Sequence, residues 1–319
     1  MFKVFSVDGS NLAERICHSI SIKTDVPPAE IIGEIKIDRF SDGEISPQFM
    51  ESVRDQKVFL VSSTVSPEKI ITLLLTIDAA KRASASEVIA IIPYFGYSRQ
   101  DRREGSRGAI GAKLMADLIQ TAGADQLISI DLHSEQIQGF FDIPVNMIPG
   151  HIAFSKFIKD LPMDDYTICS PDAGGVKRAN RFYHKFLQRF PDTTFAMLSK
   201  LRDKPNSIER MDLIGEVQGK HVIIVDDMID TAGTLTNAAR ILKENGAHTV
   251  TAIIAHGVLS GPGHERVEKS EWLDKLVITD SIDQTENPKI EVVSCAPAIA
   301  AAIDAIVSSA SMDLHLAKV

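Results

Sequence analysis

The chain has 319 residues, 44% of them apolar, which is enough to fill the cores of two domains of ordinary size. Its formal net charge of -9 argues against a dedicated nucleic-acid-binding protein, because such proteins usually carry a basic excess, and no helix-turn-helix or zinc-knuckle pattern occurs. Three widely spaced cysteines, no basic-then-apolar leader and no run of about eighteen apolar residues predict a cytoplasmic protein without a disulfide framework or a membrane span.

Short apolar segments alternate with amphipathic ones through the first half of the chain. Strands are predicted over 57–63, 87–95 and 126–133. Helices are predicted over 67–84 and 111–124. This alternation is typical of a parallel sheet with helices on both faces.

The same alternation starts again in the second half. Strands are predicted over 166–175, 194–200, 220–227 and 249–257, and helices over 176–190 and 234–247. A strand over 275–282, and a further strand and a closing helix within 290–311, complete the pattern, whereas the last residues give no clear signal. We therefore predict an α/β protein of two similar domains, 1–149 and 150–319, with the boundary near Pro149–Gly150.

The segment 222–235, VIIVDDMIDTAGTL, places Asp226 and Asp227 at the carboxyl end of a predicted strand, where ligands bind in open α/β sheets. The small residues that follow bring backbone N–H groups and a helix N-terminus together, which suits a phosphate. Carboxylates beside a phosphate accept hydrogen bonds from sugar hydroxyls or attract magnesium. The pattern predicts a sugar-phosphate site. The alternative is that the acids cap the helix and Gly233 makes a turn, although a cap needs only one carboxylate.

Two common nucleotide-binding motifs are absent from the sequence. No G-x-G-x-x-G occurs, and GEVQGK (215–220) is one residue short of a Walker sequence and precedes a strand. Any nucleotide must therefore be held by another surface.

The segment 222–235 resembles the phosphoribosyl-diphosphate loop of type I phosphoribosyltransferases and, more closely, that of the ribose-phosphate diphosphokinase family. Four other stretches are similar to motifs of that family in sequence and in order, and the likeness, to the class I type, runs from about residue 2 to about residue 310. These stretches are RFSDGE (39–44), PYFGYSRQDRR (93–103), DLHSEQIQGFFDIPV (131–145) and SPDAGGV (170–176).

The resemblance implies transfer of the diphosphoryl group of MgATP to the anomeric hydroxyl of ribose 5-phosphate, which gives 5-phosphoribosyl 1-diphosphate and AMP. It implies Mg2+ as the metal, bound by His133 and Asp172, with Asp131 as a neighbour and with Gly174 and Gly175 admitting the diphosphate close to the backbone. The implied ATP-binding residues are Phe40, Asp42, Gly43, Glu44, Arg99, Gln100, Arg102 and His133. Taken alone, RFSDGE would be interpreted as a polar turn, and a lone His133 as structural.

The resemblance also implies a ribose 5-phosphate site and a catalytic basic pair. The site residues are Arg202, Asp226, Asp227, Asp230, Thr231, Ala232, Gly233 and Thr234. Lys200 and Arg202 match the basic pair, whose charges neutralise phosphate oxygens as the bond to AMP breaks. The family usually has a further basic residue between them, where this chain has Leu201, and this departure bears on the rate.

The segment 98–108 has four arginines and two glycines, a composition typical of a mobile cationic flap that closes over ATP, although a solvated run of charge is the alternative. Within the flap, Arg102, Arg103 and Arg107 are candidates without distinct roles.

The resemblance implies a homo-oligomer, commonly a hexamer, with ADP inhibition and phosphate activation. KRASAS (81–86) is similar to part of the regulatory surface, whereas 108–111 and 311–319 differ from the usual patterns.

Three other classes of protein are alternatives. A base-utilising phosphoribosyltransferase shares the loop but would not explain RFSDGE or a second α/β half. A catalytically silent partner of the synthetase would be expected to lose Lys200, Asp172 or the Asp226–Asp227 pair, all of which are present. A transcription factor built on this loop would need a DNA-binding segment, which is missing.

Overall fold

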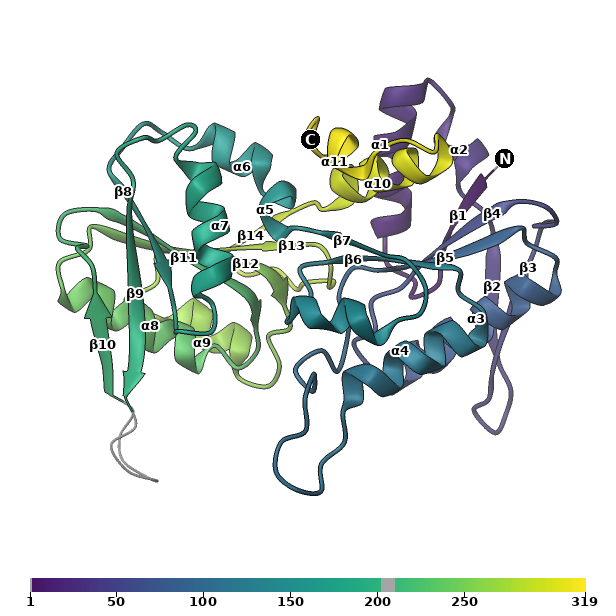
Figure 1. Ribbon diagram of the computed structural model, residues 1–319, viewed down its shortest axis with the longest axis horizontal. Helices are drawn as coiled ribbons and strands as arrows, with labels where there is room; N and C mark the ends of the chain where they lie inside the picture. Colours follow the sequence, from purple (N-terminus) through teal and green to yellow (C-terminus); the bar gives the residue numbers. More distant parts are fainter. Residues whose placement is uncertain (1, 202–209) are drawn as a thin grey trace. The chain divides into compact units, whose positions relative to one another are not determined.

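The computed structural model describes residues 2–201 and 210–319 (Figure 1). The chain forms two compact units. Unit 1 extends to Ala153 and also contains Ser281–Asp283 and Ser294–Val319, and unit 2 contains Phe154–Asp280 and Gln284–Val293. These limits differ from the predicted domains 1–149 and 150–319, most of all because the C-terminal helices belong to unit 1.

Unit 1 contains a parallel sheet whose strand order is β1-β4-β5-β6-β7. The strands are β1 (Phe2–Ser6), β4 (Lys57–Val61), β5 (Glu87–Ile92), β6 (Gln126–Ile130) and β7 (Val145–Ile148). An antiparallel hairpin, β2 (Ile35–Arg39) and β3 (Ile45–Phe49), forms a separate small sheet.

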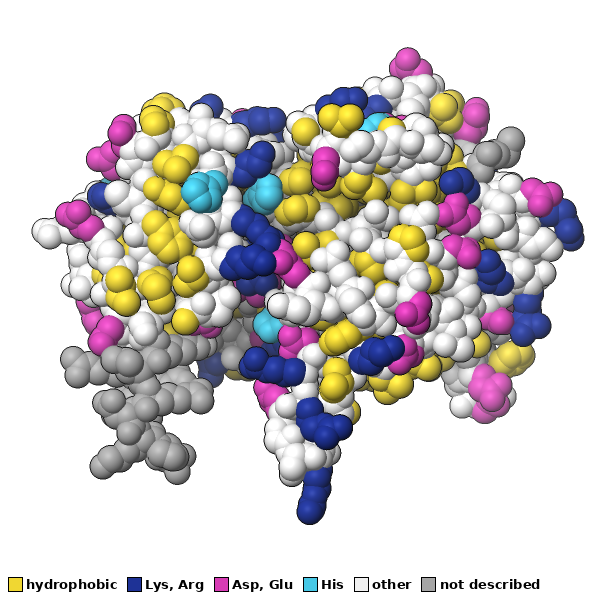
Figure 2. Space-filling model, viewed as in Figure 1, with side chains coloured by type: hydrophobic (Ala, Val, Ile, Leu, Met, Phe, Trp, Pro, Cys, Tyr) yellow, Lys and Arg dark blue, Asp and Glu magenta, His cyan; other side chains and the backbone are white. Residues whose placement is uncertain are grey.

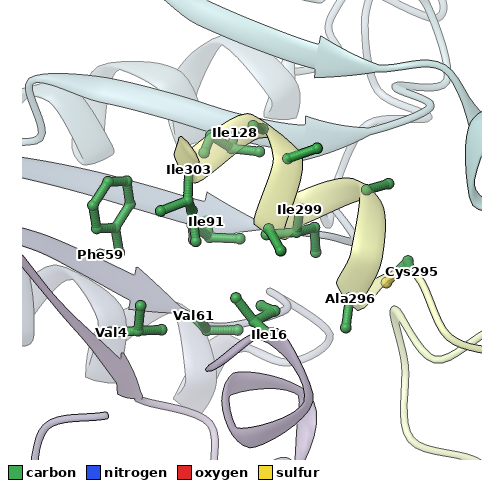
Figure 3. Packing of buried hydrophobic residues seen from close by; sticks show 14 of the residues in the cluster. Val4, Ile16, Phe59, Val61, Ile91, Ile128, Cys295, Ala296, Ile299 and Ile303 are labelled. Atoms are coloured by element: carbon green, nitrogen blue, oxygen red, sulfur yellow. The ribbon is translucent and has the colours of Figure 1, made fainter. Parts of the chain in front are cut away.

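Side-chain alternation along the strands builds two cores, one on each face of this sheet. Phe59 and Val61 of β4 join the core under α1 (Leu12–Thr24) and α10 (Ala296–Val307), where Figure 3 shows Ile16 and Ile299 beside them. Val58 and Leu60 join the opposite core, under α3 (Pro67–Arg82) and α4 (Gly111–Ala122). Short helices complete unit 1: α2 (Pro28–Ile31), the 3-10 helix η1 (Glu135–Phe140), α5 (Gly150–Ala153) and α11 (Met312–Leu316).

In its described residues, unit 2 contains a seven-stranded sheet of order β10-β9-β8-β11-β12-β13-β14, in which the β9–β10 pairing is antiparallel. The strands are β8 (Tyr166–Ser170), β9 (Thr194–Leu201), β10 (Arg210–Ile214), β11 (His221–Ile229), β12 (Thr249–Gly257), β13 (Lys275–Thr279) and β14 (Ile290–Val293). One face is covered by α7 (Val176–Phe186) beside the short α6 (Ser155–Asp160), and the other by α8 (Gly233–Glu244) and α9 (Gly263–Lys269).

The two units repeat one plan, which confirms the predicted pair of α/β folds. The order β1-β4-β5-β6-β7 of unit 1 corresponds to β8-β11-β12-β13-β14 of unit 2, and each of these sheets is parallel. The strand β11 in unit 2 therefore has the place that β4 has in unit 1. Each of the two strands is followed, after a short loop, by a helix.

The predicted elements differ from the structure mainly at their ends. The helix predicted over 176–190 ends at Phe186, and the strand predicted over 220–227 continues to Ile229. The elements that were not predicted are β1, α1, α2, the β2–β3 hairpin, η1, β7, α5, α6, β10, α9 and α11. Among the described residues, no helix has the length and apolar character needed to cross a membrane.

Candidate active site

The carboxylate pair lies where β11 loses one of its two neighbours. The pairing of β11 with β8 ends at Ile224, whereas its pairing with β12 continues to Ile229. Asp226 and Asp227, predicted as the last two residues of the strand, therefore lie inside β11, which continues to Ile229, but beyond the end of β8. Their side chains reach the carboxyl edge of the parallel sheet, where ligands bind in open α/β folds.

Arg178, from the first turn of α7, holds both carboxylates. Its Nη1 lies 3.3 Å from Oδ1 of Asp226 and 3.0 Å from Oδ1 of Asp227. The Asp227 side chain is only 4% exposed, and that of Asp226 is 28% exposed. The backbone N–H of Asp227 also donates to Oδ1 of Asp226 at 2.9 Å. One cation thus compensates two adjacent acids in a largely buried place.

The pKa of Asp226 in this pair differs from that of an ordinary surface acid. Burial, followed by the charge of Asp227 and a hydrogen bond with it, raises the pKa of Asp226 well above its ordinary value of 3.8. Arg178 opposes this rise without cancelling it. A hydroxyl or a cation that binds the ionised form of Asp226 would therefore offset the cost of ionising this side chain.

The loop that follows β11 turns sharply into α8. Ala232 has φ +61°, in the left-handed region, and α8 begins at Gly233. The N–H of Thr236 donates to the carbonyl of Ala232, so the preceding N–H groups of the first turn have no partner within the helix. Left-handed and right-handed residues in succession make a concave set of N–H groups that suits an anion.

A second loop, between β12 and α9, supports this one from outside. Ser260 donates its hydroxyl to Oδ1 of Asp230, and Nη1 of Arg266 donates to the carbonyl of Thr231 at 2.9 Å. A Cβ added to Gly263 would lie 2.6 Å from the carbonyl oxygen of Asp230, so only glycine allows this approach.

Asp172 lies in the loop after β8, the strand next to β11. Its Oδ1 accepts the N–H of Gly175 at 2.9 Å, and its own carbonyl accepts the hydroxyl of Ser170 at 2.7 Å. A Cβ on Gly175 would approach the Ser170 hydroxyl to 3.0 Å. The loop is thus tightly wound, and it places a half-buried carboxylate at the same edge of the sheet as Asp226 and Asp227.

The predicted catalytic pair is only partly covered by the described residues. Lys200 lies near the end of β9, where it pairs with Met211 of β10. Arg202 lies outside the described residues, which resume at Arg210.

The residues of unit 1 that are predicted to bind ATP lie in two places. Phe40, Asp42, Gly43 and Glu44 form the turn of the β2–β3 hairpin, where Gly43 has φ +96° and the N–H of Glu44 donates to Oδ1 of Asp42 at 3.1 Å. The hairpin turn is thus polar, and in addition it presents the Phe40 ring, which is 61% exposed.

The other residues follow β5 and β6, which are neighbours in the sheet. Arg99, Gln100 and Arg102 begin the loop 98–108 after β5, and His133 follows β6. The N–H of Ala112 in α4 donates to the carbonyl of Gln100 at 3.2 Å, which ties the base of the loop. The loop protrudes beside α4 (Figure 1), and Figure 2 shows Lys and Arg side chains at its tip. Among the described residues, no three His, Cys, Asp or Glu side chains form a group that could hold a metal ion by themselves.

Two arginines of the site were missed by reasoning from the sequence. Arg178 comes three residues after Gly175, in the first turn of the helix that follows SPDAGG, a position that faces the neighbouring strand end. Arg266 has no comparable signal, because its contact with Thr231 joins residues 35 positions apart.

Known proteins are similar to this chain in sequence and in fold. Residues 2–123 match the family described as the N-terminal domain of ribose phosphate pyrophosphokinase, and residues 191–316 match the phosphoribosyl synthetase-associated domain. A ribose-phosphate pyrophosphokinase of Porphyromonas gingivalis is 45% identical over 98% of this chain and 96% of its own length. That of Helicobacter hepaticus is 42% identical over 98% of both. A crystal structure of phosphoribosylpyrophosphate synthetase from Mycobacterium smegmatis is 33% identical, with TM-score 0.83, covering 97% of this chain and 99% of that one.

Proposed function

This chain belongs to the ribose-phosphate pyrophosphokinase family, and we propose that the loops of unit 2 described above bind its ribose 5-phosphate. The enzyme transfers the diphosphoryl group of ATP to the anomeric hydroxyl of ribose 5-phosphate. The products are 5-phosphoribosyl 1-diphosphate and AMP, and the first supplies nucleotide biosynthesis. Likeness to synthetases over nearly the whole chain argues against a base-utilising phosphoribosyltransferase.

The substrate assignment rests on one observation. The loop 230–234, which can bind an anion, directly follows the strand that carries Asp226 and Asp227. The 5-phosphate lies in the loop formed by Asp230, Thr231, Ala232, Gly233 and Thr234, where N–H groups converge. The carboxylates of Asp226 and Asp227 accept hydrogen bonds from the ribose hydroxyls. Arg178 opposes the rise in the pKa of Asp226 and so favours its ionised form, which is the form that accepts hydrogen bonds only.

ATP binds through residues of unit 1. The exposed ring of Phe40 stacks on adenine, and Asp42 or Glu44 accepts from its exocyclic amine, with Gly43 shaping the turn. Arg99, Gln100, Arg102 and His133 contact the base and the phosphates, and the loop 98–108 closes to exclude water from the diphosphoryl group.

Magnesium enters with ATP, and Asp172 and His133 are its protein ligands in this proposal. The carboxylate of Asp172 fits this role, because magnesium prefers hard oxygen ligands and usually takes few from protein and the rest from water and phosphates, whereas the imidazole of His133 is a softer nitrogen donor. The hydrogen bond from Gly175 orients the Asp172 carboxylate for this role. When bound, the ion neutralises part of the phosphate charge.

Lys200 and Arg202 complete the chemistry. The anomeric oxygen forms a bond to the β-phosphorus as it loses its proton, and the bond from that phosphorus to the α–β bridging oxygen breaks, leaving AMP with the electron pair. Phosphoryl transfer of this kind depends on alignment and on neutralising charge that develops on the bridging oxygen. The two cations supply that charge, and Arg202 also contacts ribose 5-phosphate.

We further propose that the enzyme acts in the cytoplasm as a homo-oligomer, a hexamer by analogy with its family, with ADP and phosphate as regulators. Sedimentation of the purified protein, with and without phosphate, tests the assembly.

Phosphorus NMR tests the reaction. Incubation with ribose 5-phosphate and MgATP is expected to give AMP and a diphosphate ester at C1 of the sugar. Formation of ADP, or use of phosphoribosyl diphosphate with a free base and no need for ATP, would refute the proposed function.

A further inference from the structure

The loop 230–234 is held on its carbonyl side by the segment between β12 and α9. The N–H groups of Val258 and Leu259 both donate to the carbonyl of Ile229, at 2.9 and 3.1 Å, which aligns the two loops. Arg266 then donates to the carbonyl of Thr231 at 2.9 Å. Its Nη1 also lies 3.3 Å from the point where a Cβ of Gly233 would stand, so the guanidinium lies against the first residue of α8.

The hydrogen bond from Arg266 fixes the direction of the peptide group between Thr231 and Ala232. A trans peptide is planar, and its C=O and N–H point in opposite directions. The carbonyl of Thr231 and the N–H of Ala232 belong to the same peptide group. When Arg266 fixes the carbonyl toward α9, the N–H of Ala232 must point away from α9, toward the concave side of the loop.

The backbone at Ala232 does not hold this direction by itself. Ala232 has φ +61°, a conformation that residues with a Cβ rarely adopt and that persists only when the surroundings impose it. Its methyl group is buried, with 4% exposure, so a second restraint comes from packing. The Arg266 bond is the polar restraint on the carbonyl side.

We propose that Arg266 is a positioning residue of the ribose 5-phosphate site. By anchoring the carbonyl of Thr231 it orients the 231–232 peptide group, and it thereby sets the affinity of the loop for the 5-phosphate. This inference rests on the proposed function, because it takes the loop 230–234 as the 5-phosphate site. A direct contact between Arg266 and the phosphate is the competing role, and the two make different predictions.

The first test compares steady-state kinetics of Arg266→Met with the wild type. Methionine keeps the aliphatic stem and removes the donors and the charge. We expect the KM for ribose 5-phosphate to rise about tenfold or more, because a small misplacement of a binding group is costly, while the KM for ATP changes by less than about twofold. Arg240→Met is the matched control, because Arg240 is an exposed arginine on α8 that pairs with Glu244 on the same helix. It should leave both constants close to those of the wild type.

The second test separates positioning from direct contact. Glycine adopts a positive φ without steric cost. Ala232→Gly therefore removes the strain of the left-handed conformation that Arg266 helps to maintain. If Arg266 positions the peptide, Ala232→Gly in the Arg266→Met background should recover a large part of the lost affinity. If Arg266 contacts the phosphate, the double variant should bind no better than Arg266→Met, and this result would overturn the positioning role.

The third test needs no substrate. Amide hydrogen exchange of peptides that contain 231–235 is measured on the folded, ligand-free protein, and Arg266→Met should speed it relative to Arg240→Met. Unchanged exchange would overturn the inference itself. Faster exchange with an unchanged KM for ribose 5-phosphate would instead refute the assignment of this loop to the 5-phosphate, and with it the proposed site.

Discussion

The guanidinium of Arg178 lies 3.0 Å from the carboxylate of Asp227 and joins the helix after β8 to the strand β11. Because β8 and β11 are parallel neighbours, the first turn of the helix after one strand comes level with the carboxyl end of the other. The same nitrogen lies 3.3 Å from Asp226, so a single side chain contacts both acids.

Replacing Arg178 with methionine should weaken ribose 5-phosphate binding. The loss of a charge-assisted contact of this kind costs about 1.5–3 kcal/mol, so we expect the KM for ribose 5-phosphate to rise about ten- to a hundredfold. Without the cation the pKa of Asp226 rises further, so the acidic limb of the pH profile should move to higher pH. Lys185→Met, an exposed position on α7, is the control. An unchanged acidic limb would contradict the role given to Arg178.

The raised pKa of Asp226 should make stability depend on pH. Ionising a group whose folded pKa lies above its unfolded value costs stability, so this cost is absent below the ordinary pKa of 3.8, grows as the pH rises from there to the raised pKa, and is constant above it. Asp226→Asn removes the cost. We expect the free energy of unfolding in urea to rise for the variant relative to the wild type between pH 4 and pH 8. The rise should be about 1.4 kcal/mol for each unit by which the pKa of Asp226 is raised. The exposed Asp192→Asn should show no such trend. A constant difference between Asp226→Asn and the wild type across this range would refute the assignment.

Much of the fold follows from local patterns in the sequence. The strands β4, β5, β11 and β12 are short apolar runs followed by amphipathic helices, and this alternation suffices to predict parallel sheets. The place of the acids and of the small-residue loop between a strand and a helix was also predictable, because an apolar run precedes them and an amphipathic segment follows.

The parts that were not predicted depend on contacts distant in sequence. The helix α10 is apolar on nearly every side and so must be buried, but its sequence does not say which sheet it covers, and it packs on unit 1. The contacts of Arg178 and Arg266 are set by which strands are neighbours. The left-handed conformation lies at Ala232 and not at Gly233, because α8 begins at the glycine itself.

Gly263 should be intolerant of any side chain. A Cβ at this position would stand 2.6 Å from the carbonyl oxygen of Asp230, and backbone must move to admit it. We expect Gly263→Ala to lower the free energy of unfolding by about 1–3 kcal/mol and to raise the KM for ribose 5-phosphate more than that for ATP. Gly139→Ala provides the comparison, because nothing lies within 4 Å of its added Cβ. Equal unfolding midpoints for the two variants would show that the two loops of unit 2 do not depend on this close approach.

Lys200 should act on the transition state and not on substrate binding. It lies near the end of β9, paired through its backbone with Met211, at the start of the basic stretch that continues to Arg202 in the sequence. Charge on the bridging oxygen grows only as the bond to AMP breaks, and an interaction that strengthens during the reaction lowers the barrier without tightening the substrate complex. Removing one preorganised charge of this kind commonly costs about a hundred- to a thousandfold in turnover, or roughly 3–4 kcal/mol.

Lys200→Ala should therefore lose turnover by about that factor while both Michaelis constants change little. Leu201→Ala is the matched control, because it truncates the next residue of the same strand without removing a charge, and its turnover should stay near that of the wild type. If Lys200→Ala kept its turnover and only raised the KM for ATP, Lys200 would be a binding residue. The charge that stabilises the departing AMP would then have to come from Arg202 or from the arginines of the loop 98–108.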